Sequence, residues 1–590
     1  MGTVADLQSE WARLVVHSFV EAGVRDAVIS PGSRSTPFTI AALEQAGLRC
    51  ISALDERSAA HYALGQARAT GRPSLILCTS GSAPANYFPA VIEASEAGVP
   101  LVVLSADRPP ELLRCGANQT TDQVGLYGRH VRFFAQIGEA RDDDLTLRAV
   151  KRLATRAVFE ALGHRPGPVH LNAQARKPLE PTVARSEDAG VHARVQAILQ
   201  EPLRALSASR GVDADAVKSV VRALDQAARP LVLCGPAPAQ QAEIRGDLQE
   251  LADRAGLLIA AESSAQLRFG AGADSVLGAL DTAWRANGGG DALTPDFVLQ
   301  LGANPTSKGW EDLCLAHRIR RAVVHPWDWV DPASNAEMII QADVGDFIRA
   351  LARERFTAAS RDSAFVSKLQ RAEQIVWAAA DDVLSAADDQ LTEAGVARAV
   401  RDAAPAQSAL VLGNSLPIRN FDTWVRPSEA ALRIFSQRGV SGIDGVVSGA
   451  AGVASCTPEA TALLVGDVSF LHDINGLQLA AQAARPLVVI VVNNGGGRIF
   501  EQLPIARLGK EEWLPYFTTP HDASMAGAAS IYGCAFETAG AVSELRVALE
   551  SAYGREGCTV IEAVVPPHGS AEQNQALHSA VEQALQREGL

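Results

Sequence analysis

The sequence has few of the features that mark disulfide-rich, zinc-binding or membrane proteins. Its eight cysteines are scattered over 590 residues without a C-x-x-C pair, which excludes a zinc ribbon and a disulfide framework and favours buried free thiols in a reducing compartment. The longest obvious apolar strand, residues 487–492, is far shorter than the roughly 20 residues needed to cross a bilayer. Asp6 and Glu10 precede any apolar run, so we expect no secretory signal and a soluble, cytoplasmic protein.

Positive charge is also scarce. The chain has 53 Lys and Arg against 67 Asp and Glu, a net charge of −14, and no dense basic run. A long phosphate backbone therefore lacks the electrostatic surface that it needs, and we expect no nucleic-acid partner. The 12 histidines show no metal-ligand spacing. A local basic pocket for a small anion remains compatible with this composition.

Strand and helix patterns alternate along the chain. Arg-Pro precedes an apolar run at residues 75–78, 231–234 and 487–492, one in each third of the sequence. Continuous apolar runs are typical of parallel strands covered on both faces, and Ala-rich amphipathic stretches such as 58–69 and 474–484 supply helices. We predict an α/β fold of three doubly wound domains with mainly parallel sheets.

Two stretches read as connectors between these domains. Residues 176–187 contain two prolines and mixed charges, and residues 353–390 form a polar, Ala-rich helical passage. The predicted domains are therefore 1–190, 191–365 and 366–590.

The strongest chemical signal lies in the last third. Val465-Gly466-Asp467-Val468-Ser469 ends a predicted strand, and Asn494 follows 27 residues after Asp467 in an Asn-Asn-Gly-Gly-Gly run. Open α/β sheets place ligands at the carboxyl ends of their strands. The Asp467 carboxylate, the Asn494 amide oxygen and the Gly496 carbonyl are hard oxygen ligands that suit Mg²⁺, with Mn²⁺ as an alternative. Two ordinary strand-end turns are the other interpretation.

This Gly-Asp-x-Ser and Asn-Asn pattern resembles that of the thiamine diphosphate-dependent decarboxylases and carboligases, although Val468 stands where they prefer Gly. The resemblance implies pyrimidine-binding, central and diphosphate-binding domains. It also implies that Glu56, at a strand-to-helix turn, is the catalytic acid on the cofactor's aminopyrimidine ring; taken alone, Glu56 reads as a helix-start acid. The implied cofactor-binding residues are Thr79, Ser80, Gly81, Asn86, Ile443, Gly466, Ser469 and Asn494.

Further segments are more specific. They are residues 30–37 (Ser-Pro-Gly-Ser-Arg-Ser-Thr-Pro), 105–112, 115–119, 413–419, 438–445 and 497–500. They resemble, in order, the motifs of the 2-succinyl-5-enolpyruvyl-6-hydroxy-3-cyclohexene-1-carboxylate (SEPHCHC) synthase family. This resemblance implies a transferase of menaquinone biosynthesis that decarboxylates 2-oxoglutarate and adds the succinyl unit to isochorismate in 1,4 fashion, with thiamine diphosphate as cofactor.

Each of these substrates carries two carboxylates, so the pocket needs fixed cations. The resemblance implies that both substrates are bound by the following residues: Ser33, Arg34, Arg108, Asn118, Gln119, Lys308, Ser415, Arg419, Arg438, Ile499, Phe500 and Leu503. Among the small departures from the family pattern, Arg498 is bulkier and more basic than expected and leaves local substrate contacts open.

The resemblance further implies a homodimer with active sites at the subunit interface, with a tetramer as an alternative. Two other functions stay open. An acetohydroxyacid-synthase-like 2-oxo-acid decarboxylase would share Glu56, Asp467 and Asn494 but would not explain the arginine motifs. A catalytically silent binding protein on the same fold would have no need to keep both Glu56 and the metal ligands.

Overall fold

The computed structural model describes residues 4–181, 189–207, 211–272, 275–286, 290–317, 319–357 and 361–590. These residues form three six-stranded sheets in which every strand pair is parallel. By its internal contacts the chain divides into two compact units. The first comprises Met1–Ala208, Gln437–Pro458 and His472–Ala484, and the second comprises Ser209–Ser436, Glu459–Leu471 and Arg485–Leu590.

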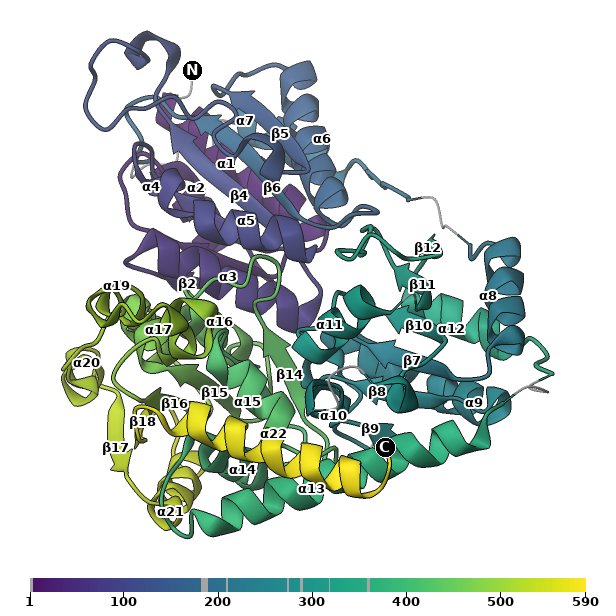
Figure 1. Ribbon diagram of the computed structural model, residues 1–590. Helices are drawn as coiled ribbons and strands as arrows, with labels where there is room; N and C mark the ends of the chain where they lie inside the picture. Colours follow the sequence, from purple (N-terminus) through teal and green to yellow (C-terminus); the bar gives the residue numbers. More distant parts are fainter. Residues whose placement is uncertain are drawn as a thin grey trace. The chain divides into compact units, whose positions relative to one another are not determined.

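The first unit is built on one sheet with the strand order β2-β1-β3-β4-β6-β5 (Figure 1). Its strands are β1 (Asp26–Ile29), β2 (Arg49–Ser52), β3 (Ser74–Cys78), β4 (Leu101–Asp107), β5 (Phe133–Gly138) and β6 (Pro168–Gln174). Its helices are α1 (Val4–Glu21), α2 (Thr36–Glu44), α3 (Glu56–Thr70), α4 (Ala83–Asn86), α5 (Phe88–Ala97), α6 (Asp144–Ala161), α7 (Ala189–Gln200), α16 (Val446–Ala454) and α18 (Leu477–Ala480).

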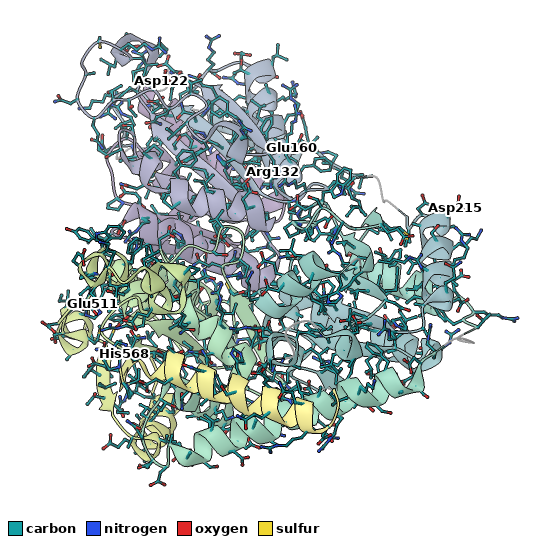
Figure 2. The ribbon with its side chains drawn as sticks, viewed as in Figure 1. Asp122, Arg132, Glu160, Asp215, Glu511 and His568 are labelled. Carbon is teal, nitrogen blue, oxygen red and sulfur yellow. The ribbon has the colours of Figure 1, made fainter. Side chains whose placement is uncertain are left out.

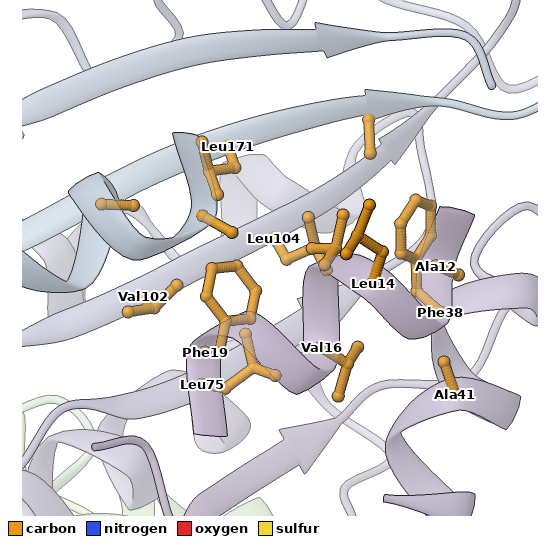
Figure 3. Close-up of a cluster of buried hydrophobic side chains, with 14 of the residues drawn as sticks. Ala12, Leu14, Val16, Phe19, Phe38, Ala41, Leu75, Val102, Leu104 and Leu171 are labelled. Carbon is orange, nitrogen blue, oxygen red and sulfur yellow. The ribbon is translucent and has the colours of Figure 1, made fainter. Parts of the chain in front are cut away.

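The main core of this unit lies on one face of the sheet. Figure 3 shows Leu14 and Phe19 of α1 packed with Leu75 of β3 and Leu104 of β4. Successive side chains of a strand point to opposite faces, so Leu75 and Leu77 enter this core and Ile76 faces the other side, where α3 contacts the sheet. All five residues of β3 are buried, as expected for a strand that is covered on both faces.

Helices α3 and α16 approach each other closely through glycines. A methyl group on Gly65 of α3 would lie 2.0 Å from the carbonyl oxygen of Gly449, and one on Gly452 would lie 2.0 Å from that of Tyr62. No side chain fits at either position, so the two helix backbones are in direct contact.

This contact yields a stability prediction. Gly65→Ala is expected to destabilise the protein by about 1–3 kcal/mol, because the helices have to separate to admit the methyl group. Urea denaturation followed by circular dichroism measures the effect. Gly246→Ala is the control, because its added methyl group meets nothing within 4 Å. An unchanged midpoint for Gly65→Ala would contradict the close approach.

The second unit contains two sheets (Figure 1). The central one has the order β12-β11-β10-β7-β8-β9. Its strands are β7 (Pro230–Cys234), β8 (Leu258–Ala261), β9 (Val276–Leu277), β10 (Phe297–Leu301), β11 (Arg320–His325) and β12 (Met338–Gln341). Its helices are α8 (Ala214–Gln226), α9 (Arg245–Ala255), α10 (Leu280–Ala286), α11 (Lys308–Ala316) and α12 (Val344–Ala352).

The last sheet has the order β14-β13-β15-β16-β18-β17. Its strands are β13 (Ala409–Leu412), β14 (Arg433–Ser436), β15 (Thr461–Gly466), β16 (Leu487–Asn493), β17 (Ala535–Ala539) and β18 (Cys558–Val564). Its helices are α13 (Ser363–Ala386), α14 (Glu393–Ala403), α15 (Leu416–Trp424), α17 (Asp467–His472), α19 (Pro515–Thr518), α20 (Met525–Ile531), α21 (Val542–Tyr553) and α22 (Gly569–Arg587). The strand order reverses between β13 and β15, which creates a crevice at their carboxyl ends.

The predicted α/β fold and its parallel strands at 75–78, 231–234 and 487–492 are confirmed. The predicted helical stretch 474–484 is wrong in detail, because it breaks into a 3₁₀ turn at Ile474–Gly476, the four-residue α18 and irregular backbone.

The domain boundaries stay predictions. The one at 190 falls within α7, whose Val195 and Ile198 belong to the first core, and the one at 365 falls within α13. The first predicted connector, 176–187, lies partly outside the described residues.

The eight cysteines, all within the described residues, form no disulfide, and four of them are buried: Cys78, Cys234, Cys314 and Cys558. The expectation of buried thiols is therefore confirmed for these four and wrong for Cys115, which is exposed. Cys50, Cys456 and Cys534 are half-buried. Within the described ranges, no helix combines the length and the hydropathy that a membrane span requires.

Candidate active site

A cavity opens at the carboxyl ends of β13, β15 and β16 in the second unit. Residues that directly follow these three strands line it, and they include the predicted Ser415, Gly466, Asp467, Ser469, Asn494 and Gly496. The crevice at the reversal of strand order is therefore the place where the last-third motif gathers.

Asp467 is held rigidly at the wall of this cavity. Its side chain is buried; Oδ1 accepts a hydrogen bond from the backbone N–H of Val468 at 2.7 Å, and Oδ2 accepts one from that of Gly496 at 2.9 Å. The His521 ring nitrogen Nε2 lies 3.4 Å from Oδ2. Burial raises the pKa of Asp467, and the backbone donors oppose that rise. A cation would stabilise this buried carboxylate.

Asn494 presents an oxygen that has no hydrogen-bond partner. Its amide nitrogen donates to Glu393 at 2.8 Å, while its Oδ1 is buried and unpaired among the described residues. A buried acceptor without a donor costs about 1–3 kcal/mol, so this atom fits a metal ligand better than a structural group. Asp467 and Asn494 thus supply the oxygen chemistry that Mg²⁺ requires.

Glu393 was missed by the sequence analysis. It begins α14, is 4% exposed, and accepts hydrogen bonds from the amides of Asn494 at 2.8 Å and Asn420 at 2.7 Å. Burial, with a smaller contribution from the charge of Asp467, raises the pKa of Glu393 to about 7. An acid at the start of a helix is ordinary in sequence, so no local pattern marks this residue.

The glycine run after β16 adopts a backbone that side chains would obstruct. Gly495 has φ +75° and Gly496 has φ +141°, and a methyl group on Gly496 would lie 2.5 Å from the carbonyl oxygen of Thr518. The neighbouring Gly497 N–H donates to the same Thr518 oxygen at 2.6 Å. The turn can therefore bring backbone groups close to a ligand such as a diphosphate.

Arg498 contacts this turn and lines the same cavity. Its Nε donates to the carbonyl oxygen of Asn494 at 3.1 Å, and its Nη1 pairs with Glu501 at 2.6 Å. Glu501 in turn lies 2.8 Å from Nδ1 of His568. Arg498, which departs from the family pattern, thus contacts the turn itself.

A second, larger cavity adjoins the first in the same unit, since Leu416 and Asn420 line both. It brings together the predicted Lys308, Arg419, Ile499 and Leu503. Lys308 forms ion pairs with Glu311 and Asp312, and the Phe500 ring packs at 5.8 Å from that of Phe517 instead of lining the cavity.

The first unit gathers a separate set of predicted residues around the turn after β3. Ser80 lies at the centre of this set: its hydroxyl contacts both the Arg108 guanidinium and the carbonyl oxygen of Gln119. Arg108 also donates to the carbonyl oxygen of Asn118 at 3.0 Å, and the loop beyond is bounded by the Arg114–Asp122 ion pair (Figure 2).

Two cations are concentrated at this turn. Arg34 is 6% exposed and donates to the carbonyl oxygen of Ala175 at 2.7 Å. Burial first, and then the charge of nearby Arg108, lower the pKa of Arg34. Two partly desolvated guanidiniums at one place form a site for an anion.

A buried amide chain supports the turn and was also missed by the sequence analysis. Gln123 accepts a hydrogen bond from the Gly81 N–H at 3.1 Å and donates to Asn172 at 2.9 Å. Asn172 donates to Asp107 at 2.8 Å, and the neighbouring Arg108 N–H donates to the same carboxylate. This chain fixes Gly81 and Arg108 relative to each other.

The other predicted residues of the first unit have different surroundings. Ser33 and Asn86 are exposed, and the buried Thr79 packs against Gly32. Ile443 is half-buried and precedes Asp444, which pairs with His61 of α3 at 3.5 Å. Arg438 is half-buried and precedes Gly439 and Val440, whose N–H groups donate to the buried Glu93 at 2.9 and 2.7 Å.

Glu56 is the first residue of α3. Asp55 caps this helix by accepting a hydrogen bond from the Arg57 N–H at 2.9 Å. The Glu56 side chain is half-buried, and its carboxylate accepts no hydrogen bond within the described part of the chain. Its backbone is thus fixed while its carboxylate is available for a ligand.

Comparison with known proteins is consistent with these two sets of residues. Residues 10–126 match the model of the N-terminal TPP binding domain of thiamine pyrophosphate enzymes, and residues 424–563 match that of their C-terminal TPP binding domain. A 2-succinyl-5-enolpyruvyl-6-hydroxy-3-cyclohexene-1-carboxylate synthase of Sorangium cellulosum is 44% identical over 98% of this chain and 96% of its own length.

The chain belongs to the SEPHCHC synthase family. Synthases of this name from Halobacterium salinarum and Geobacillus kaustophilus are 38% and 37% identical over 98% and 99% of the chain, and each is covered over 99% of its own length. The predicted family is therefore confirmed. The roles of the individual site residues stay predictions.

Proposed function

We propose that the protein is a thiamine diphosphate-dependent transferase of menaquinone biosynthesis. It decarboxylates 2-oxoglutarate and adds the succinyl unit to isochorismate in 1,4 fashion, giving SEPHCHC and CO₂. The observation that carries the proposal is the unpaired Asn494 oxygen beside the buried Asp467 carboxylate in a glycine-lined cavity, in a chain of this family.

Thiamine diphosphate, when bound, supplies the carbanion and the electron sink for the decarboxylation. Asp467, the Asn494 side-chain oxygen and the Gly496 carbonyl hold Mg²⁺ or Mn²⁺, while Gly466 and Ser469 approach the diphosphate. Thr79, Ser80, Gly81, Asn86 and Ile443 form the remaining cofactor contacts. Glu56 holds and transfers the proton at the aminopyrimidine ring nitrogen, because its carboxylate is unpaired and its backbone is fixed by the start of α3.

Basic residues bind the substrate carboxylates. Arg34 and Arg108 already lie close to each other, and Lys308 and Arg419 line the larger cavity. Arg438 completes the set, and Ser33, Asn118, Gln119 and Ser415 add neutral hydrogen bonds. Ile499, Phe500 and Leu503 provide apolar surface for the ring of isochorismate.

We also propose a cytoplasmic homodimer with active sites at the subunit interface, and the three domains 1–190, 191–365 and 366–590. Analytical ultracentrifugation tests the dimer. A monomer that is fully active at all concentrations would contradict it.

The function is tested by a complete assay with thiamine diphosphate, Mg²⁺, 2-oxoglutarate and isochorismate, in which each component is omitted in turn. Mass spectrometry is expected to detect the succinylated adduct in the complete mixture alone. Consumption of 2-oxoglutarate without adduct would assign a simple decarboxylase instead, and cofactor binding without any turnover would assign a silent binding protein.

Arg108→Lys tests the anion site. Lysine keeps the charge but cannot contact Ser80 and Asn118 with two fixed nitrogens, so we expect KM for the substrates to rise about 10–100-fold. Cofactor affinity is expected to change much less. Arg114→Lys, at an exposed ion pair on the same loop, is the control. An equal loss of substrate and cofactor affinity would indicate a structural role.

A further inference from the structure

We propose that Glu393 is a positioning residue that sets the orientation of the Asn494 amide, so that its oxygen and not its nitrogen faces the metal. This inference rests on the proposed function, because it concerns the same metal position. It assigns a role to a residue that no motif contains.

The hydrogen bonds of Glu393 fix the orientation of two asparagine amides. Oε1 accepts from the Asn494 amide nitrogen at 2.8 Å, and Oε2 accepts from the Asn420 amide nitrogen at 2.7 Å. Both carboxyl oxygens accept in this arrangement, so both amides turn their NH₂ groups toward Glu393. Each amide therefore directs its oxygen away from Glu393.

For Asn494 this orientation decides the chemistry of the cavity. An amide oxygen is a ligand for Mg²⁺, whereas an amide NH₂ group is a donor that repels a cation. With its nitrogen held by Glu393, Asn494 leaves Oδ1 buried and without a partner among the described residues. An unpaired oxygen is the expected consequence of a hydrogen bond that holds the amide nitrogen in this way.

The backbone of Asn494 is fixed independently. Nε of Arg498 donates to its carbonyl oxygen at 3.1 Å, so the main chain and the side chain are held by different residues. Groups that orient a metal ligand typically change metal affinity 10–100-fold when they are altered. Glu393 has the position of such a group, because it is hydrogen-bonded directly to the proposed metal ligand Asn494.

Glu393→Gln tests the inference. Glutamine has nearly the same shape but offers one acceptor and one donor, so one of the two asparagine amides loses its fixed orientation. We expect the affinity for Mn²⁺, measured by electron paramagnetic resonance with thiamine diphosphate present, to fall about 10–100-fold. Saturating Mn²⁺ is expected to restore binding.

An Asn494→Asp background distinguishes orientation from general damage. A carboxylate at position 494 has two equivalent oxygens and needs no orienting, and Glu393→Gln would then supply it with a donor. In this background we expect Glu393→Gln to leave Mn²⁺ affinity unchanged or to raise it. Glu373→Gln is the matched control, because Glu373 accepts from the N–H groups of Gly278 and Ala279 outside the cavity lining.

The outcomes separate cleanly. Unchanged Mn²⁺ affinity in Glu393→Gln, or an equal loss in both backgrounds, would overturn the orienting role while the proposed function stands. Failure of the unsubstituted protein to bind Mn²⁺ with thiamine diphosphate would overturn the proposed function itself and the inference with it.

Discussion

Replacing Glu56 by glutamine is expected to lower kcat about a thousand-fold while thiamine diphosphate still binds. Glutamine keeps the length of the side chain and one hydrogen-bond acceptor, but it cannot transfer a proton, and general acid–base groups typically contribute 10²–10⁴-fold. The helix start is unaffected, since Asp55 caps α3. Steady-state consumption of 2-oxoglutarate and calorimetric binding of the cofactor give the two measurements.

A second readout makes the role of Glu56 specific. Deuterium exchange at the C2 position of the bound thiazolium ring is expected to slow in parallel with kcat, because both depend on the same proton transfer. Asp55→Asn is the control, since asparagine caps helices as well as aspartate does. Full activity in Glu56→Gln would remove this residue from the mechanism.

Replacing Asp467 by asparagine is expected to reduce metal affinity by at least about 100-fold and to abolish turnover at ordinary Mg²⁺ concentrations. The change removes the only formal negative charge among the three proposed ligands, and a buried charge–cation interaction is strong in a low-dielectric site. It also sets an NH₂ group against one of two backbone donors, those of Val468 and Gly496. Metal-dependent binding of thiamine diphosphate measures the loss.

The control for Asp467→Asn is Asp522→Asn, an exposed aspartate close to His521 in the sequence. We expect it to bind metal like the unsubstituted protein. Metal-dependent cofactor binding that survives in Asp467→Asn would show that the ion lies elsewhere. Circular dichroism at equal concentrations checks that both variants are folded.

Local sequence patterns were sufficient to find one strand of each sheet. The apolar runs at 75–78, 231–234 and 487–492 are buried strands, because a run without polar alternation is stable only where both faces are covered. The same logic placed Asp467 and Asn494 at one edge, since β15 and β16 are parallel neighbours. The prediction of one helix over residues 474–484 was wrong, because helical periodicity does not reveal that Gly476 packs against Ser448.

The supporting residues of the site could not be predicted in this way. Glu393 lies 74 residues before Asp467 and looks like a common helix-start acid, and its contact with Asn494 exists only after α14 packs beside the last sheet. Gln123 and Asn172 are likewise ordinary amides until β4 and β6 bring them behind the turn at Gly81. Their roles depend on tertiary contacts that no short segment encodes.

The bond between the Gly497 N–H and the Thr518 carbonyl has an evolutionary consequence. It brings two points of the chain together, so residues 498–517 leave and return at one place beside the glycine turn that contains Gly496. Ile499 and Leu503, within this excursion, line the larger cavity. Apart from Arg498, whose side chain holds the carbonyl oxygen of Asn494, insertions, deletions and substitutions within this excursion can therefore alter which acceptor is recognised while the turn at Gly496 keeps its shape. Substrate preference and cofactor retention can then diverge independently among descendants of one ancestral enzyme.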